Sequence, residues 1–110
     1  MSSFRIFGRV LNDYSRRGIP GLRVEVWDKH VKDDHLCGTA VTDYRGAYQV
    51  EFDESAYREA PKDIFPNVYL KVFSGEKLIK STEDNVRRNL PAGDTEIVLE
   101  VELSKPRVAP

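Results

Sequence analysis

The feature that most constrains this chain is a period-two alternation of apolar and polar residues in several short segments. In an extended strand successive side chains point to opposite faces, so such a segment buries one face and exposes the other. The expected inward-facing sets are Leu22, Val24 and Val26; Tyr48, Val50 and Phe52; Val68, Leu70 and Val72; and Ile97, Leu99, Val101 and Leu103. Alternation of this kind is typical of antiparallel sheets with one buried face, and it predicts an all-β, two-sheet sandwich.

Turn-forming residues separate the segments that are rich in β-branched and aromatic residues. Gly46 follows Asp43 closely enough to form a tight hairpin loop, and residues 74–76 form a second one. Only residues 54–59 favour a short helical turn. The sequence therefore predicts seven antiparallel strands, at Phe4 to Val10, Leu22 to Trp27, Gly38 to Asp43, Ala47 to Phe52, Asn67 to Phe73, Lys77 to Thr82 and Thr95 to Leu103.

Length and composition limit the number of domains and the classes of partner. A chain of 110 residues accommodates one hydrophobic core, so we expect a single domain over residues 1–104 and a Pro-containing tail over residues 105–110. The formal net charge of -1 provides no field that would attract nucleic acid. No stretch approaches the roughly 20 apolar residues that cross a bilayer, and the opening residues carry no signal-peptide pattern. We expect a soluble chain, and its compartment stays open because a piece of an exported protein would look the same.

Three segments carry a resemblance to a known family. Residues 8–29, GRVLNDYSRRGIPGLRVEVWDK, resemble the opening strand, the Gly-containing turn and the second strand of transthyretin-like domains. Residues 38–52, GTAVTDYRGAYQVEF, resemble the T-D-x-x-G-x-aromatic hairpin of that family, and residues 67–82, NVYLKVFSGEKLIKST, resemble its later hairpin. The likeness extends over residues 4–103 and includes the carboxypeptidase regulatory-like modules. It implies a sandwich of the transthyretin, or prealbumin, type.

The resemblance also implies a class of function. Bacterial domains of this kind are parts of large surface, toxin-like or secretion-associated proteins, in which they join or dock other domains. The leading hypothesis is therefore a non-catalytic interaction module that binds a protein partner or its own parent chain and needs no cofactor. Because the matching motifs consist of turn glycines and core residues, they describe the scaffold and not a site.

The catalytic relatives of this sandwich require residues that the chain lacks or places elsewhere. Intradiol dioxygenases have a related sandwich and bind ferric iron with two tyrosines and two histidines, whereas His30 and His35 share one loop here. The 5-hydroxyisourate hydrolases use a C-terminal Tyr-Arg-Gly-Ser, and here residues 44–46 place Tyr-Arg-Gly in a central hairpin. Cys37 is near His35 but has no evident orienting third group. We therefore predict no catalytic residues, and a small hydrolase is the least favoured alternative.

The charged loop WDKHVKDDHLCG, residues 27–38, is the strongest candidate for a metal site. Its aspartates offer the oxygen ligands that calcium prefers, and the pattern resembles the Asp-rich loop of calcium-dependent C2 domains. The candidate calcium ligands are Asp28, Asp33, Asp34 and Asp43. Zinc held by His30, His35 and one aspartate is another alternative. The favoured interpretation is a polar loop in which aspartates bond their own backbone turn, and calcium-assisted binding of a membrane or glycan is the alternative function.

Three aromatic residues are candidates for a binding surface. If the valines of the second and fifth predicted strands face inward, then Trp27, Tyr69 and Phe73 lie on the opposite face. Rigid aromatic rings dominate interface energetics, so an exposed set predicts a surface for a protein or glycan partner. The alternative is that loop 83–93, or the segment around residues 64–65, folds over the rings.

Overall fold

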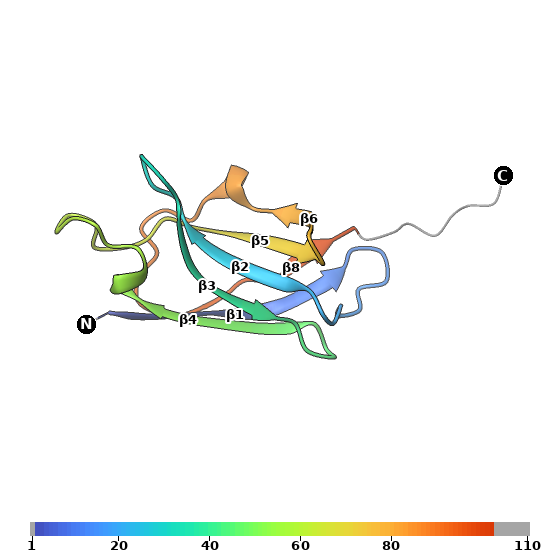
Figure 1. The fold of residues 1–110 in the computed structure, drawn as a ribbon. Coiled ribbons are helices and arrows are strands. Elements are labelled where there is room, and N and C mark those ends of the chain that lie inside the picture. The colour runs from blue at the N-terminus through green and yellow to red at the C-terminus, as the bar shows by residue number, and fades with distance from the viewer. Residues whose placement is uncertain (1, 103–110) are drawn as a thin grey trace.

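The computed structural model describes residues 2–102 as two β-sheets that pack face to face (Figure 1). The first sheet contains β1 Ser3–Asn12, β4 Ala47–Asp53, β7 Gly93–Glu96 and β8 Leu99–Val101. The second contains β2 Arg23–Asp28, β3 His35–Val41, β5 Val68–Ser74 and β6 Lys77–Ser81. The predicted all-β sandwich is confirmed, with eight strands in place of seven. The predicted boundary at residue 104, the tail over residues 105–110 and the inward position of Leu103 lie outside the described residues.

The first sheet corrects the prediction of a purely antiparallel fold. Strand β1 pairs antiparallel with β4 but parallel with both β7 and β8. The single strand expected from Thr95 to Leu103 is divided at Ile97, whose amide donates to Phe7 O at 2.8 Å and whose carbonyl accepts a bond from Tyr48 Oη at 2.5 Å. A Cβ atom at Gly8 would lie 2.1 Å from Ile97 O, so the chain can cross β1 here only over a glycine.

The second sheet has the strand order β3-β2-β5-β6, and all its pairs are antiparallel. The β5–β6 hairpin turns where it was predicted, at Gly75. Register shifts lie between Val26 and Trp27, in the pairing of β2 with β3, and between Val72 and Phe73, in the pairing of β5 with β6. Strands β3 and β4 are consecutive but belong to different sheets, and they lie side by side where the chain passes between the layers (Figure 1).

The alternating residues of both inner faces form one core, as predicted. Every inward residue named from the sequence within the described range is less than 9% exposed. The core also contains residues that the alternation did not single out, namely Phe4, Ile6, Val10, Tyr57 and Leu90. The Phe4 and Phe52 rings stack with centroids 5.0 Å apart, and Tyr57 packs against both edge-on. Tyr57 therefore closes one end of the sandwich.

Two single-turn 3₁₀ helices lie in the loops, where one helical turn was expected. The predicted turn is η1 Glu54–Ala56, which begins after Asp53, whose side chain accepts a bond from the amide of Ser55. The unpredicted one is η2 Glu83–Asn85, which follows β6. In the described part of the chain no helix is long and apolar enough to span a bilayer.

Candidate functional site

The outward side of the second sheet carries the predicted aromatic residues in cross-strand rows. In an antiparallel ladder directly paired residues point to the same side, so the register defines each row. The first row is Leu36, Trp27 and Tyr69; the middle row is Thr39, Glu25, Lys71 and Ser81; and the third row is Val41, Arg23, Phe73 and Leu78. We call these three rows the outer face. Two rows with apolar residues therefore flank a polar one.

Tyr69 belongs to the outer face but is not exposed, which corrects the expected patch of three aromatic rings. Only 1% of Tyr69 is accessible, because its ring stacks on Trp27 with centroids 6.4 Å apart and an interplanar angle of 12°. Its Oη atom donates to Asp34 Oδ2 at 2.5 Å. The Nζ atom of Lys29 lies 6.0 Å from the centroid of the same ring and pairs with Asp34 and Glu83. Individual side chains therefore cover Tyr69.

Cationic side chains lie over the remaining rings. Lys71 Nζ is 4.8 Å from the centroid of the Trp27 ring, and Arg23 Cζ is 4.4 Å from that of the Phe73 ring. Glu25 accepts a bond from Trp27 Nε1 at 3.0 Å and one from Arg23 Nε at 3.1 Å. These contacts hold Trp27 and Phe73 half-buried in fixed orientations, and fixed rings lose little entropy when a partner binds.

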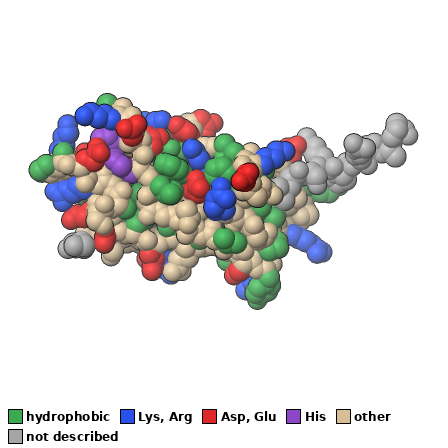
Figure 2. All heavy atoms as spheres, in the orientation of Figure 1, with side chains coloured by type: hydrophobic (Ala, Val, Ile, Leu, Met, Phe, Trp, Pro, Cys, Tyr) green, Lys and Arg blue, Asp and Glu red, His purple; other side chains and the backbone are tan. Residues whose placement is uncertain are grey.

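The exposed apolar residues of the outer face were missed by the sequence analysis. Leu36 is 46% exposed, Val41 66% and Leu78 47%. All three lie on the edge strands β3 and β6. Only the strand register places them beside residues of the central strands β2 and β5. The displaced register next to Trp27 brings Leu36 opposite that ring, and no local sequence pattern reports such a shift. In the view of Figure 2, hydrophobic side chains form small patches with charged side chains between them.

Two of the candidate calcium ligands are engaged by the protein itself. Asp28 is 3% exposed, and its Oδ1 atom accepts a bond from the amide of Asn67 at 2.8 Å. The carboxylate of Asp34 accepts bonds from Tyr69 Oη and from the amide of His30. Burial raises the pKa of Asp34, but these two bonds and the charge of Lys29 lower it by more, so its pKa lies below the ordinary value.

The other two candidate ligands do not join them. Asp33 is exposed at the tip of the β2–β3 loop. Asp43 lies beyond the far end of β3, roughly 20 Å away along an extended strand, and its Oδ1 atom accepts bonds from the amides of Arg45 and Ala47. The bonds from these amides hold the pKa of Asp43 below its ordinary value. Across residues 2–102, no group of three or more His, Cys, Asp or Glu residues is arranged to hold a metal ion.

The two histidines do meet, at the end of the sandwich where the β2–β3 loop lies. Their ring centroids are 5.0 Å apart. His35 Nδ1 lies 3.1 Å from Asp28 Oδ2, and its Nε2 lies 3.2 Å from Glu59 Oε1. Glu59 could not be linked to the histidines from the sequence, because it is far from the β2–β3 loop along the chain and reaches them through the loop that follows η1.

Cys37 has no base beside it. Within residues 2–102, the Sγ atom of Cys37 packs against the core and donates a hydrogen bond to the backbone oxygen of His35, at 3.9 Å, while both nitrogens of the His35 ring face carboxylates. Burial, and then the charge of Asp28, raise the pKa of the Cys37 thiol to about 12. The thiol is therefore protonated at neutral pH and is a poor nucleophile.

A hollow of about 460 Å³ lies between β5, η2 and β8. Its floor is made by Val68, Leu70 and Leu99, each less than 5% exposed, while Lys80 and Arg87 are at its rim. Because the floor side chains are already covered, an apolar ligand would bury little additional surface there. This hollow is thus a weaker candidate than the outer face.

Comparison with known proteins identifies the fold. No family model and no curated protein matches the chain. A 9R-lipoxygenase from Cyanothece PCC8801 superposes over 91% of this chain and 16% of its own, with a TM-score of 0.61 and 18% identity. A chlorocatechol 1,2-dioxygenase from Pseudomonas putida superposes over 92% of this chain and 60% of its own, with a TM-score of 0.52 and 13% identity. The chain spans less than two thirds of either protein, and at these identities the likeness shows the fold alone.

Proposed function

We propose that this chain is a non-catalytic interaction module of the transthyretin-like kind, which docks onto or within a larger bacterial surface, toxin-like or secretion-associated assembly. The docking surface is the outer face. The observation that carries this proposal is the exposure of Leu36, Val41 and Leu78 beside half-buried aromatic rings. Apolar residues around fixed aromatic rings are typical of the centre of a protein–protein interface.

The chemistry of the outer face defines the partner. The first and third rows complement apolar side chains of a partner. The cations Lys71 and Arg23, on the central strands, favour carboxylates on the partner opposite them. The single carboxylate of these rows, Glu25, is already bonded to Trp27 and Arg23. A protein surface with an apolar strip and acidic residues beside it therefore complements the outer face.

Two further observations support a binding role. The same fold accounts for 16% of a lipoxygenase chain, so a sandwich of this size occurs as a small part of a longer protein. The thiol of Cys37 is half-buried and protonated, and both nitrogens of the His35 ring face carboxylates, which argues against nucleophilic chemistry at this pair.

The proposal is tested by capture of a partner from an extract of the source organism. The bait is the full chain, the double variant V41K/L78K, or the control V98K. Val98 lies outside the outer face and is 51% exposed, so the control introduces a lysine at a similar exposure. A docking face predicts that the wild-type chain and V98K retain the same protein, while V41K/L78K retains it at least tenfold less, because buried lysines leave unpaired charges in the interface.

Circular dichroism and urea unfolding of all three baits establish that each is folded. Equal retention by V41K/L78K and the wild-type chain would show that the outer face is not the docking surface. Failure of the wild-type chain to retain any protein near stoichiometry would overturn the interaction role itself.

A further inference from the structure

One of the two histidines at the end of the sandwich, His35, has a protonation requirement that the outer face does not explain. His35 presents Nδ1 to Asp28 at 3.1 Å and Nε2 to Glu59 at 3.2 Å. A neutral imidazole has one N–H, so it can donate to only one of these carboxylates. Both contacts are hydrogen bonds only when the His35 ring is protonated.

His30 extends the same cluster toward a third carboxylate, that of Asp63. Its Nε2 atom lies 3.4 Å from Glu59 Oε2 and 3.7 Å from Asp63 Oδ2. Its Nδ1 atom is buried without a hydrogen-bond partner among residues 2–102. Asp63 is held in place by the amides of Glu59 and Ala60, and the bond from Ala60 contributes most to a pKa below the ordinary value. His30 therefore faces Glu59 and also Asp63, whose lowered pKa keeps its carboxylate ionised further into the acidic range.

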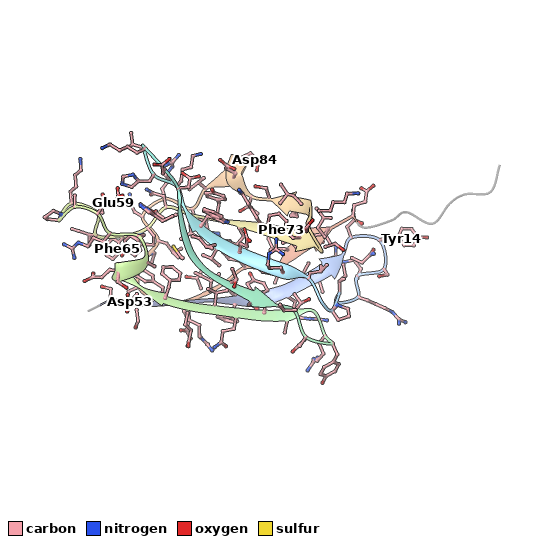
Figure 3. All side chains as sticks on the ribbon, in the orientation of Figure 1. Tyr14, Asp53, Glu59, Phe65, Phe73 and Asp84 are labelled. Carbon is pink, nitrogen blue, oxygen red and sulfur yellow. The ribbon has the colours of Figure 1, made fainter. Side chains whose placement is uncertain are left out.

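The cluster joins segments that are distant in sequence. The histidines belong to the β2–β3 loop and the start of β3, whereas Glu59 and Asp63 belong to the connection between β4 and β5. We call residues 54–66 the connecting segment, which carries Glu59 and Phe65 at one end of the molecule (Figure 3). The remaining titratable groups beside His35 are neutral at physiological pH, because burial raises the pKa of both Cys37 and Tyr57.

We infer that His35 forms a pH-dependent clasp with Glu59, which fastens the connecting segment to the β2–β3 end when the His35 ring is protonated and releases it when that ring is neutral. The clasp controls the position of exposed apolar residues, since Ile64 is 54% and Phe65 41% exposed on the connecting segment. It is a device separate from the proposed docking face, and either can fail without the other.

The direction of the pH dependence follows from His35. The bond to Asp28, followed by the bond to and charge of Glu59, outweighs burial and raises the pKa of His35. A raised pKa means that the closed clasp is fully favoured below the ordinary imidazole value of ~6.5 and is lost as the pH rises through the raised value. Only the contribution of Glu59 depends on closure, because Asp28 and His35 are paired within the β2–β3 ladder.

The test combines two measurements on the full chain in buffer with EDTA, so that no metal ion occupies the histidines. NMR titration of the imidazole protons gives the pKa of His35. Hydrogen exchange of residues 57–66 at pH 5.5 and 8.5, corrected for the intrinsic rate, gives the protection of the connecting segment. The clasp predicts that the protection factors of residues 57–66 are lower at pH 8.5 than at pH 5.5. The expected decrease is tenfold for each pH unit by which closure raises the pKa of His35.

The variant E59Q removes the carboxylate that closes the clasp, and E54Q is its matched control. Glu54 lies on the same segment but pairs with Arg58 and with neither histidine. E59Q is expected to lower the pKa of His35 and to remove most of the pH dependence of protection, while E54Q preserves both. An unchanged pKa of His35 in E59Q, or equal protection of wild-type residues 57–66 at the two pH values, would overturn the clasp.

Discussion

Among single residues, Tyr69 explains why the outer face is only partly open. The alternation in β5 predicts its side, and the structure agrees. Its burial was not predictable, because it depends on Lys29 and Asp34, which reach the ring only after the β2–β3 loop has folded over β5. The phenol bond to Asp34 helps to hold the pKa of that carboxyl below its ordinary value despite burial.

Replacement of Tyr69 by phenylalanine tests this bond. We expect Y69F to unfold with a free energy about 1.5–3 kcal/mol lower than the wild-type value at pH 7, the usual worth of a hydrogen bond to a charged group. The loss should shrink as the pH falls through the lowered pKa of Asp34, because a depressed carboxylate stabilises the fold only while ionised. Urea unfolding at pH 7 and pH 2.5 measures both effects.

The matched control is Y14F, since Tyr14 is 70% exposed and its ring lies outside the core. Its free energy of unfolding should stay within about 0.5 kcal/mol of the wild-type value. A similar loss in Y14F and Y69F would show that the bond to Asp34 contributes nothing specific.

For the strands and turns, sequence reasoning succeeded where the signal is local. The inward residues of β2, β4 and β5 and the turns at Gly46 and Gly75 all follow from short-range patterns. The prediction of one antiparallel strand from Thr95 to Leu103 was wrong, because the structure has two strands there, β7 and β8, which are both parallel to β1. Alternation determines which side a residue faces but contains no information about the direction of the neighbouring strand.

Two hairpin glycines provide a matched pair for the turn assignment. Both have positive φ, +79° at Gly46 and +60° at Gly75. A Cβ atom at Gly46 would lie 2.5 Å from Val10 O and 2.7 Å from Gly18 Cα, whereas nothing lies within 4 Å of one at Gly75. We expect G75A to lose about 1 kcal/mol from backbone strain alone and G46A about 3 kcal/mol or more, because its backbone must also shift. Thermal unfolding of the two variants compares them, and equal losses would contradict the close packing around Gly46.

In the whole molecule, the sandwich was predictable and the sites were predictable only in part. The Asp-rich loop was the candidate for a metal site, but the carboxylates of Asp28 and Asp34 bind the protein's own groups. Asp43 was grouped with Asp28 by sequence proximity, although β3 separates them. Conversely, Glu59 completes the histidine cluster from a distant segment. Extended strands move sequence neighbours apart, so proximity along the chain is a poor guide to sites in a β-sandwich.

The outer face gives the most direct test of the account. Hydroxyl-radical footprinting of the chain, alone and bound to its captured partner, measures the accessibility of individual side chains. Docking through the outer face predicts reduced labelling of Leu36, Val41 and Leu78 in the complex, with unchanged labelling of Tyr14 and Tyr44, which are 70% and 82% exposed elsewhere. Protection of Tyr14 or Tyr44 while the three outer-face residues keep their labelling would contradict it.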